Sequence, residues 1–517
     1  MKPFVLRPLA AALLAALSAG CESSVAGWEQ LPPLEPAATD ADAGSWRMLV
    51  LPSAAHFAVP IPALVESDAY RAELAAIRAA QQGITAAQRR AVEYWSGGGV
   101  LRWNQVTREL VARFSLPPAP GANGSYPVPD PENPFADPRF PFASPPYAAR
   151  AYGYVSVAQY EALKSAWHWK HRYGRPSPAH VDPSIMALAP VSALPAYPSE
   201  DAVLSAVTAE MLKVLFPAAV EEITRLAAEQ REAALLSGRA SASDVAAGVA
   251  LGKSVAGAVA ALAVGDGMRA AAGNRAQWKA LEEAAVTRGE IPWRSQELPA
   301  RPPMLPGFGQ VRAWTMTPEE VLAAQPPPPP STGSPRMAAE LAEVRRTVDH
   351  LTRPQLAIAH RWNDGAGTYT PPGHWNDIAA EHVRDARMSE VRAARAFALL
   401  NMAMHDAAVG CWAAKFRYFN PRPSQLDPGI RTVVGLPNFP AYPSGHSTFS
   451  AAAASVLSQL FPGAAGELAA LAEEAGISRL YGGIHYRSDI EQGKEHGLRV
   501  AEFAVRLARA DGAGASR

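Results

Sequence analysis

One stretch of the sequence occurs twice in the chain. Matching residues of the two copies lie a constant number of positions apart, which is the number that separates Trp167 from Trp412. Other positions matched by this offset are Lys170 and Lys415, Asp244 and Asp489, and the runs 195–199 and 440–444, which both read Pro-Ala-Tyr-Pro-Ser. Upstream, Trp103 pairs with Trp375 at a larger offset, because the first copy carries a Pro-rich insertion near residues 117–146. Tryptophan is rare, with 12 among 517 residues, so chance is a poor explanation. The repeat predicts one structural unit that occurs twice.

Both units are expected to be helical. Alanine-rich stretches dominate the chain and β-branched residues are sparse, a composition that favours helices over strands. Helical periodicity is clearest in residues 203–216, 218–236, 245–264, 390–412, 448–460 and 493–509. Residues 451–460 are apolar on nearly every side, as in a helix surrounded by others. We therefore predict an all-α fold of two tandem, related helical bundles.

The predicted organisation has five parts. They are a targeting segment (1–21), an irregular N-terminal wrap (22–80), a degenerate first bundle (81–260), a linker with a Pro-rich loop (261–344) and a second bundle (345–510). The loop contains Pro326 to Pro330, which suits an exposed connection.

The N-terminus has the pattern of a bacterial lipoprotein signal. Lys2 and Arg7 give a basic start, residues 9–17 are mostly apolar, and small residues lead to Cys21. The pattern predicts export, with Cys21 lipidated and the mature chain periplasmic or tethered to a membrane. A cleaved secretory signal without lipid is the alternative. We find no other apolar run of the ~20 residues that a spanning helix needs, so no transmembrane helix is expected in the mature chain.

Charge and cysteine content restrict the partners and the cross-links. The chain has 48 basic and 48 acidic residues, which argues against a nucleic-acid binder. Cys411 is the only cysteine besides Cys21, so no intrachain disulfide is expected.

Three short motifs of the second unit can together hold an oxyanion. In chain order they are Lys415 with Arg422, then Ser444, Gly445 and His446, then Arg479 with His485 and Asp489. The lysine and the two arginines can surround a tetrahedral anion, and each guanidinium offers forked donors. Ser444 and Gly445 precede a helical run, so their backbone N–H groups are expected at a helix N-terminus, where anions bind. Each residue alone would be ordinary, but all three motifs occur in order within one short part of the chain.

Two histidines supply the expected reactivity. His485 and Asp489 are four residues apart and would share a helix face. The carboxylate can accept the Nδ1 proton of His485, which leaves Nε2 free as a nucleophile or a ligand. His446 is distant in sequence and can serve as general acid and base.

The first copy lacks this chemistry. At the offset of the repeat, it has Glu200 and Asp201 in place of Gly445 and His446, Ala234 in place of Arg479, and Ala240 in place of His485. The active site is therefore predicted in the C-terminal bundle. Trp412, Lys415, Ser444 and Asp489 keep identical counterparts in the first copy, so part of their role is expected to be structural.

The motifs from Lys415 to Asp489 resemble those of the superfamily that joins type 2 phosphatidic acid phosphatases, bacterial acid phosphatases and vanadium-dependent haloperoxidases. A wider resemblance, to bacterial haloperoxidase-like proteins, rests on residues 371–376 and 439–446. It implies two four-helix bundles with the site in one. It also implies that vanadate is the cofactor, or that phosphate occupies the same site.

The resemblance also implies a role for each residue. His485 would be the vanadate ligand or the phosphate-attacking nucleophile, His446 the acid–base group, and Asp489 the residue that orients His485. The oxyanion would be held by Lys415, Arg422, Ser444, Gly445 and Arg479. Trp412 and Phe439 look like apolar positions that flank the cofactor in chloride-oxidising relatives.

Three functions remain open at the level of sequence. The first is a vanadate-dependent haloperoxidase that oxidises halide with hydrogen peroxide. The second is a phosphatase acting through a phosphohistidine, and the third is a non-enzymatic exported protein that binds phosphate or a partner. Other histidines lack ligand spacing and are expected to be structural: His168, His360, His374, His405 and His496. Of these, His405 with Asp406 lies nearest in sequence to the Lys415 motif.

Overall fold

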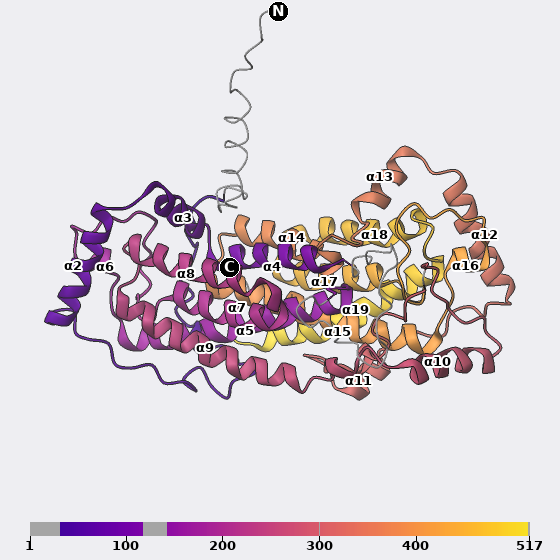
Figure 1. Ribbon diagram of the computed structural model, residues 1–517, viewed down its shortest axis with the longest axis horizontal. Helices are drawn as coiled ribbons and strands as arrows, with labels where there is room; N and C mark the ends of the chain where they lie inside the picture. The colour runs from indigo at the N-terminus through magenta and orange to yellow at the C-terminus, as the bar shows by residue number, and fades with distance from the viewer. Residues whose placement is uncertain (1–30, 117–141, 299, 515–517) are drawn as a thin grey trace, which may run out of the picture.

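The computed structural model describes residues 31–116, 142–298 and 300–514, and in these ranges it is helical without a β-strand. The predicted all-α class is confirmed. The targeting segment with Cys21 lies outside the described residues. The molecule is elongated, with α2, α3 and α6 at one end and α10, α12 and α16 at the other (Figure 1).

The first half contains eight described helices. They are α2 (Asp68–Gln82), α3 (Ala86–Ser96), α4 (Gly99–Phe114), α5 (Pro145–Tyr173), α6 (Pro178–Val181), α7 (Glu200–Leu215), α8 (Val220–Leu236) and α9 (Ala242–Val264). Two further helices, α10 (Arg275–Thr287) and α11 (Pro318–Ala323), lie in the segment that connects the halves.

The second half has the same succession of helices. They are α12 (Pro335–Asp349), α13 (Arg353–Arg361), α14 (Thr370–Asp385), α15 (Glu390–Tyr418), α16 (Pro423–Leu426), α17 (Gly445–Leu460), α18 (Ala465–Tyr481) and α19 (Arg487–Ala510). Five consecutive helices of each half begin at equivalent positions, because their first residues are separated by the same offset that relates Trp167 to Trp412. These helices are α5 to α9 in the first half and α15 to α19 in the second. The repeat in the sequence therefore corresponds to a repeat of helices in the structure.

Local sequence explains where the helices begin. Ser199 and Ser444 cap α7 and α17, and each side-chain oxygen accepts a backbone N–H three residues on. Thr85 and Thr352 form capping boxes with Gln88 and Gln355 at the starts of α3 and α13. Such caps satisfy N–H groups that the first helical turn leaves without partners.

Small residues let the helices pack closely. Helix α7 packs on α9, and α17 packs on α19. A Cβ atom on Gly248 would lie 2.6 Å from the Ser199 carbonyl oxygen, and one on Gly493 would lie 2.7 Å from the Ser444 carbonyl oxygen. A larger side chain at either glycine would push the helices apart.

The two halves meet along their longest helices, because α5 packs against α15 (Figure 1). Polar contacts also cross this interface. The Asn104 amide nitrogen of the first half donates to Asn376 Oδ1 of the second half at 2.8 Å, and within the second half the Asn376 amide nitrogen donates to Asn401 Oδ1 at 2.7 Å. These side chains are buried, and their mutual hydrogen bonds fix the register between the halves.

Several segments differ from the sequence prediction. Residues 68–82, assigned to an irregular wrap, form α2, and the predicted linker contains α10 and α11. We expected no further apolar run of spanning length, but the 23-residue helix α9 is long and apolar enough to cross a membrane by length and composition. Its alanine and valine content gives it that hydropathy, while one face packs on α7 and α5.

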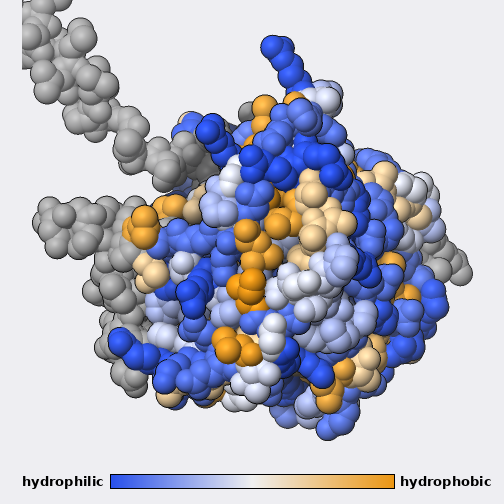
Figure 2. All heavy atoms as spheres, turned by 90° about the vertical axis from the view of Figure 1, so that its right-hand side faces the viewer, coloured by the Kyte–Doolittle hydropathy of each residue, from blue (hydrophilic) through white to orange (hydrophobic). Residues whose placement is uncertain are grey.

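The surface at the α12 and α16 end is mostly hydrophilic, with a band of apolar residues between polar ones (Figure 2).

Candidate oxyanion site

Lys415 holds the loop that precedes α17. It lies in the last turn of α15, fully buried, and its Nζ donates to the carbonyl oxygens of Pro440 at 2.9 Å, Ala441 at 2.8 Å and Pro443 at 2.5 Å. Burial lowers the pKa of its ammonium to about 7. All three donors are used by backbone, so Lys415 shapes the loop and acts on a bound anion mainly through its charge.

Arg422 offers a free donor. It precedes α16 and is fully buried. Its Nε donates to the Phe439 carbonyl at 3.0 Å, and Nη1 donates to the Ile484 carbonyl at 2.8 Å and contacts His485 Nε2 at 3.0 Å. Its Nη2 is buried without a hydrogen-bond partner among the described residues. A buried donor without an acceptor is costly, and an anion oxygen would satisfy it.

Arg479 joins the site from the last turn of α18. Its Nε donates to Ser478 Oγ at 2.9 Å, and its Nη atoms donate to the carbonyl oxygens of Ala359, Trp362 and Asn363. Burial lowers the pKa of this guanidinium to about 10, as it does for Arg422. Both remain cationic at neutral pH.

His485 has the tautomer that a ligand or nucleophile needs. Its Nδ1 lies 2.8 Å from Asp489 Oδ2, and Asp489 also accepts the Tyr486 backbone N–H at 3.1 Å. Burial and then the charge of Arg422 hold the pKa of His485 well below its usual value. The imidazole is therefore neutral, with its proton on Nδ1 and a lone pair on Nε2 beside Arg422.

His446 faces a carboxylate that the sequence analysis missed. Its Nε2 lies 3.6 Å from Asp364 Oδ2 and has no hydrogen-bond partner among the described residues. Asp364 Oδ1 lies 3.1 Å from His374 Nδ1. Burial would raise the pKa of Asp364, but the two histidines hold it well below its usual range. Burial and then the Arg479 charge lower the pKa of His446 to about 4.

Two aromatic rings line the cationic cluster. The ring centroids of Trp412 and Phe439 are 5.0 Å apart, and both rings are buried. Lys415 Nζ lies 5.0 Å from the Phe439 ring centre, and the Arg422 guanidinium carbon lies 5.1 Å from it. The face of an aromatic ring stabilises nearby cations without neutralising them.

His405 and Asp406 do not belong to this cluster. His405 Nε2 contacts the Arg312 carbonyl, and Asp406 accepts the Trp314 and Thr315 backbone N–H groups.

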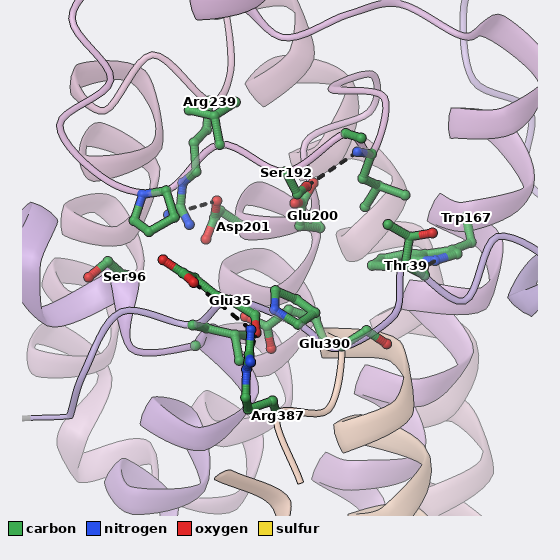
Figure 3. A pocket seen from close by; sticks show the side chains of 18 residues that line it. Glu35, Thr39, Ser96, Trp167, Ser192, Glu200, Asp201, Arg239, Arg387 and Glu390 are labelled. Atoms are coloured by element: carbon green, nitrogen blue, oxygen red, sulfur yellow. Dashed lines mark hydrogen bonds and ion pairs between the residues drawn. The ribbon is translucent and has the colours of Figure 1, made fainter. Parts of the chain in front are cut away.

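The same place in the first unit is filled differently. Lys170 donates to the Pro195 carbonyl and pairs with Glu200, which stands where Gly445 stands in the second unit. Asp244 keeps its capping role at α9 and pairs with Arg175, because Ala240 offers no imidazole. A cavity of about 520 Å³ lies beside Glu200 and Asp201, and Figure 3 shows Arg239 paired with Asp201 there.

The comparison separates shared from specific residues. Lys415, Ser444 and Asp489 keep structural contacts that Lys170, Ser199 and Asp244 also make. The second unit alone adds Arg422, Arg479, His446 and His485, at positions that hold Ser177, Ala234, Asp201 and Ala240 in the first. These four additions make the second site cationic and reactive.

Net charge at the site indicates an anionic ligand. The Arg422 and Arg479 guanidiniums and the Lys415 amine, whose pKa burial lowers to about 7, face the buried carboxyl groups of Asp364 and Asp489. Burial raises the pKa of Asp489 to about 7 as well, so the two guanidiniums are the permanent charges and outnumber the Asp364 carboxylate. A buried charge without a partner is unfavourable, and a tetrahedral oxyanion would balance it. The unpartnered Arg422 Nη2 and the Nε2 lone pair of His485 therefore fit vanadate or phosphate.

Comparison with known proteins places part of the chain in a family. Residues 395–511 match the family model described as the PAP2 superfamily. This part of the chain is a PAP2 superfamily domain. It contains each of the motifs from Lys415 to Asp489.

Two curated relatives match in sequence. A vanadium chloroperoxidase of Curvularia inaequalis is 29% identical over 126 residues, which are 19% of this chain and 21% of the relative. A non-specific acid phosphatase of Salmonella typhi is 45% identical over 64 residues, which are 12% of this chain and 25% of the relative. The chain thus matches about a fifth to a quarter of the length of these relatives.

Solved structures share the fold over most of the chain. A bacterial vanadium-dependent iodoperoxidase has a TM-score of 0.56 at 21% identity, over 78% of this chain and 96% of that one. A holo-type bacterial vanadium-dependent chloroperoxidase has a TM-score of 0.50 at 14% identity, over 75% and 97% of the two chains. These structures show that the helical fold is shared.

Proposed function

We propose that the chain is a vanadate-dependent haloperoxidase, which oxidises halide with hydrogen peroxide at the site in its C-terminal bundle. The observation that carries the oxyanion chemistry is the neutral His485, whose Nε2 lies 3.0 Å from Arg422 Nη1 within an excess of buried cations. Two features favour vanadate over a phosphoester. They are the buried aromatic pair of Trp412 and Phe439, and the fold shared with two vanadium peroxidases over at least 75% of the chain.

The residues have separate tasks in this proposal. His485 Nε2, Arg422 Nη2 and the backbone at Ser444 and Gly445 would hold vanadate, and Arg479 would contribute charge. When bound, vanadate would supply the activation of hydrogen peroxide toward halide. His446 would accept and return the proton of the peroxide, since its low pKa leaves it neutral and able to act as a base.

An acid phosphatase is the second candidate, and the 45% identity to the Salmonella typhi phosphatase favours it. His485 Nε2 would then attack phosphorus, and the leaving oxygen would take its proton from His446, which must be protonated for this step and, with a pKa of about 4, is protonated mainly in acid. Water would afterwards break the phosphorus–nitrogen bond and release phosphate. The same residues serve both reactions, because vanadate and phosphate are both tetrahedral oxyanions.

A paired assay distinguishes these functions. Protein without residues 1–21 is assayed for halogenation of a reporter with vanadate, peroxide and halide, and separately for hydrolysis of a phosphomonoester without vanadate. We expect vanadate-dependent halogenation that His485→Ala abolishes and that the exposed-site control His360→Ala retains. Hydrolysis without halogenation would replace the proposal with the phosphatase. Oxyanion binding without either turnover would indicate the non-enzymatic alternative.

A further inference from the structure

The loop between α13 and α14 differs from its counterpart in the first unit. The stretch from Trp362 to Trp375 is longer than the matching stretch from Trp95 to Trp103. Asp364 and His374 lie near the two ends of this longer segment. The loop is bent sharply, because Asp364 has a φ of 44° and Thr370 a φ of 64°. Such backbone strain is retained where surrounding contacts or function require it.

The longer loop places one carboxylate between two histidines. The Asp364 side chain is only 5% exposed, and it lies 3.1 Å from His374 Nδ1 and 3.6 Å from His446 Nε2. The Trp362 ring stacks on the His374 ring, with centroids 4.2 Å apart and planes 23° apart. His374 is therefore fixed in plane and directed at the carboxylate.

The same loop also binds the site's cation. Arg479 donates to the carbonyl oxygens of Trp362 and Asn363, directly before Asp364. Asp364 is close enough for its charge to oppose the lowering of the Arg479 pKa that burial causes. The Asp364 carboxylate thus acts on the Arg479 guanidinium through its charge and lies beside the imidazoles of His374 and His446.

We propose that His374 is a positioning residue for His446 and acts through the Asp364 carboxylate. The inference rests on the proposed function only in assigning proton transfer to His446. His374 Nδ1–H donates to Asp364 and holds the carboxylate toward His446 Nε2. The carboxylate then favours the tautomer of His446 with its proton on Nε2, and the ring orientation follows from that tautomer.

The direct test is the tautomer of His446 in the full-length folded protein. Long-range ¹⁵N spectra of histidine-labelled protein report the proton position on each ring, and His446→Gln identifies the His446 signals. His374→Phe keeps a ring against Trp362 but removes the donor, whereas His374→Asn keeps a donor near the Nδ1 position. We expect the His446 signals to change in His374→Phe and in Asp364→Asn. They should stay as in the parent protein in His374→Asn and in His382→Phe, a control on the same helix.

Kinetics give a second readout. His374→Phe should lower kcat by about 10- to 100-fold with little change in KM, and His374→Asn should recover most of the loss. Unchanged His446 signals in His374→Phe would overturn the inference, whether or not the signals change in Asp364→Asn and even if the enzyme is active. If the His446 signals change as expected but the protein catalyses neither halogenation nor hydrolysis, the positioning role of His374 stands and the proposed function is rejected. If His374→Phe does not fold, His374→Leu, which also removes the donor, takes its place.

Discussion

His485 Nδ1 lies 2.8 Å from Asp489 Oδ2, and the same carboxylate oxygen accepts the Tyr486 backbone N–H at 3.1 Å. One carboxylate therefore orients the imidazole and caps α19. In the first unit Asp244 accepts the Ser241 backbone N–H and pairs with Arg175 instead of an imidazole. Capping the helix is therefore common to both aspartates, whereas orienting an imidazole is specific to Asp489.

Asp489→Asn should reduce turnover more than it reduces stability. The amide can still accept one backbone N–H, but it cannot also favour the Nδ1 proton of His485. We expect a loss of about 10- to 100-fold in kcat, the usual size for a residue that orients a ligand. The matched control is Asp244→Asn, which should leave kcat unchanged. Equal losses in both variants would show that the effect comes from the bundle rather than from the imidazole.

Arg422→Lys should weaken oxyanion binding although it keeps the charge. Lysine lacks the planar fork that places Nη2 in the site while Nε and Nη1 hold carbonyl oxygens. Loss of a hydrogen bond to a charged group is worth about 1.5–3 kcal/mol, or roughly 10- to 150-fold in affinity. Calorimetric titration with inorganic phosphate or vanadate measures the change. The control is Arg417→Lys, in the last turn of α15 outside the site, which should bind the oxyanion with the affinity of the parent protein. Unaltered oxyanion affinity in Arg422→Lys would exclude Arg422 Nη2 as a donor to the ligand.

Lys415→Met should lower both stability and oxyanion affinity. Each buried carbonyl that loses its donor costs about 1–3 kcal/mol, and Lys415 serves three carbonyls. We expect the free energy of unfolding in urea to fall by about 3 kcal/mol or more. Lys170→Met, its counterpart, should also destabilise the chain but leave phosphate binding intact. A Lys415→Met protein with parental affinity would confine this lysine to a structural role.

Much of the architecture could be predicted because the repeat keeps its register. The predicted helix at 448–460 is found as Gly445–Leu460, which begins earlier because Ser444 caps it. Helix α2 was missed, although α2 and α12 begin at the same offset that relates Thr85 to Thr352. That offset is the signal that could have identified it. The buried side chains of α2, Tyr70, Leu74, Ile77 and Gln81, also recur at helical spacing, so both the periodicity and the comparison of copies pointed to this helix.

The site was predicted less completely than the fold. The motif residues do meet around one buried cluster, because they lie at the ends of α15, α18 and the start of α17 and α19. Asp364 and His374 were missed, because their proximity to His446 depends on a bent loop that periodicity does not describe. The three carbonyl partners of Lys415 were also beyond the sequence, since the conformation of residues 440–443 determines them.

Acid should destabilise the fold through neutral buried histidines, of which His496 is the clearest. Its Nδ1 lies 2.9 Å from the Ala324 carbonyl oxygen, and burial lowers its pKa to about 4. Between this value and the unfolded pKa of about 6.5, the unfolded chain binds a proton that the folded chain does not. The stability from this group is therefore present above about pH 6.5 and is lost as pH falls toward 4, by about 1.4 kcal/mol per pH unit. In His496→Leu, urea unfolding at several pH values should show a slope smaller by that amount, while the exposed control His360→Leu keeps the parental slope. An unaltered slope in His496→Leu would mean that this histidine is already protonated in the folded protein.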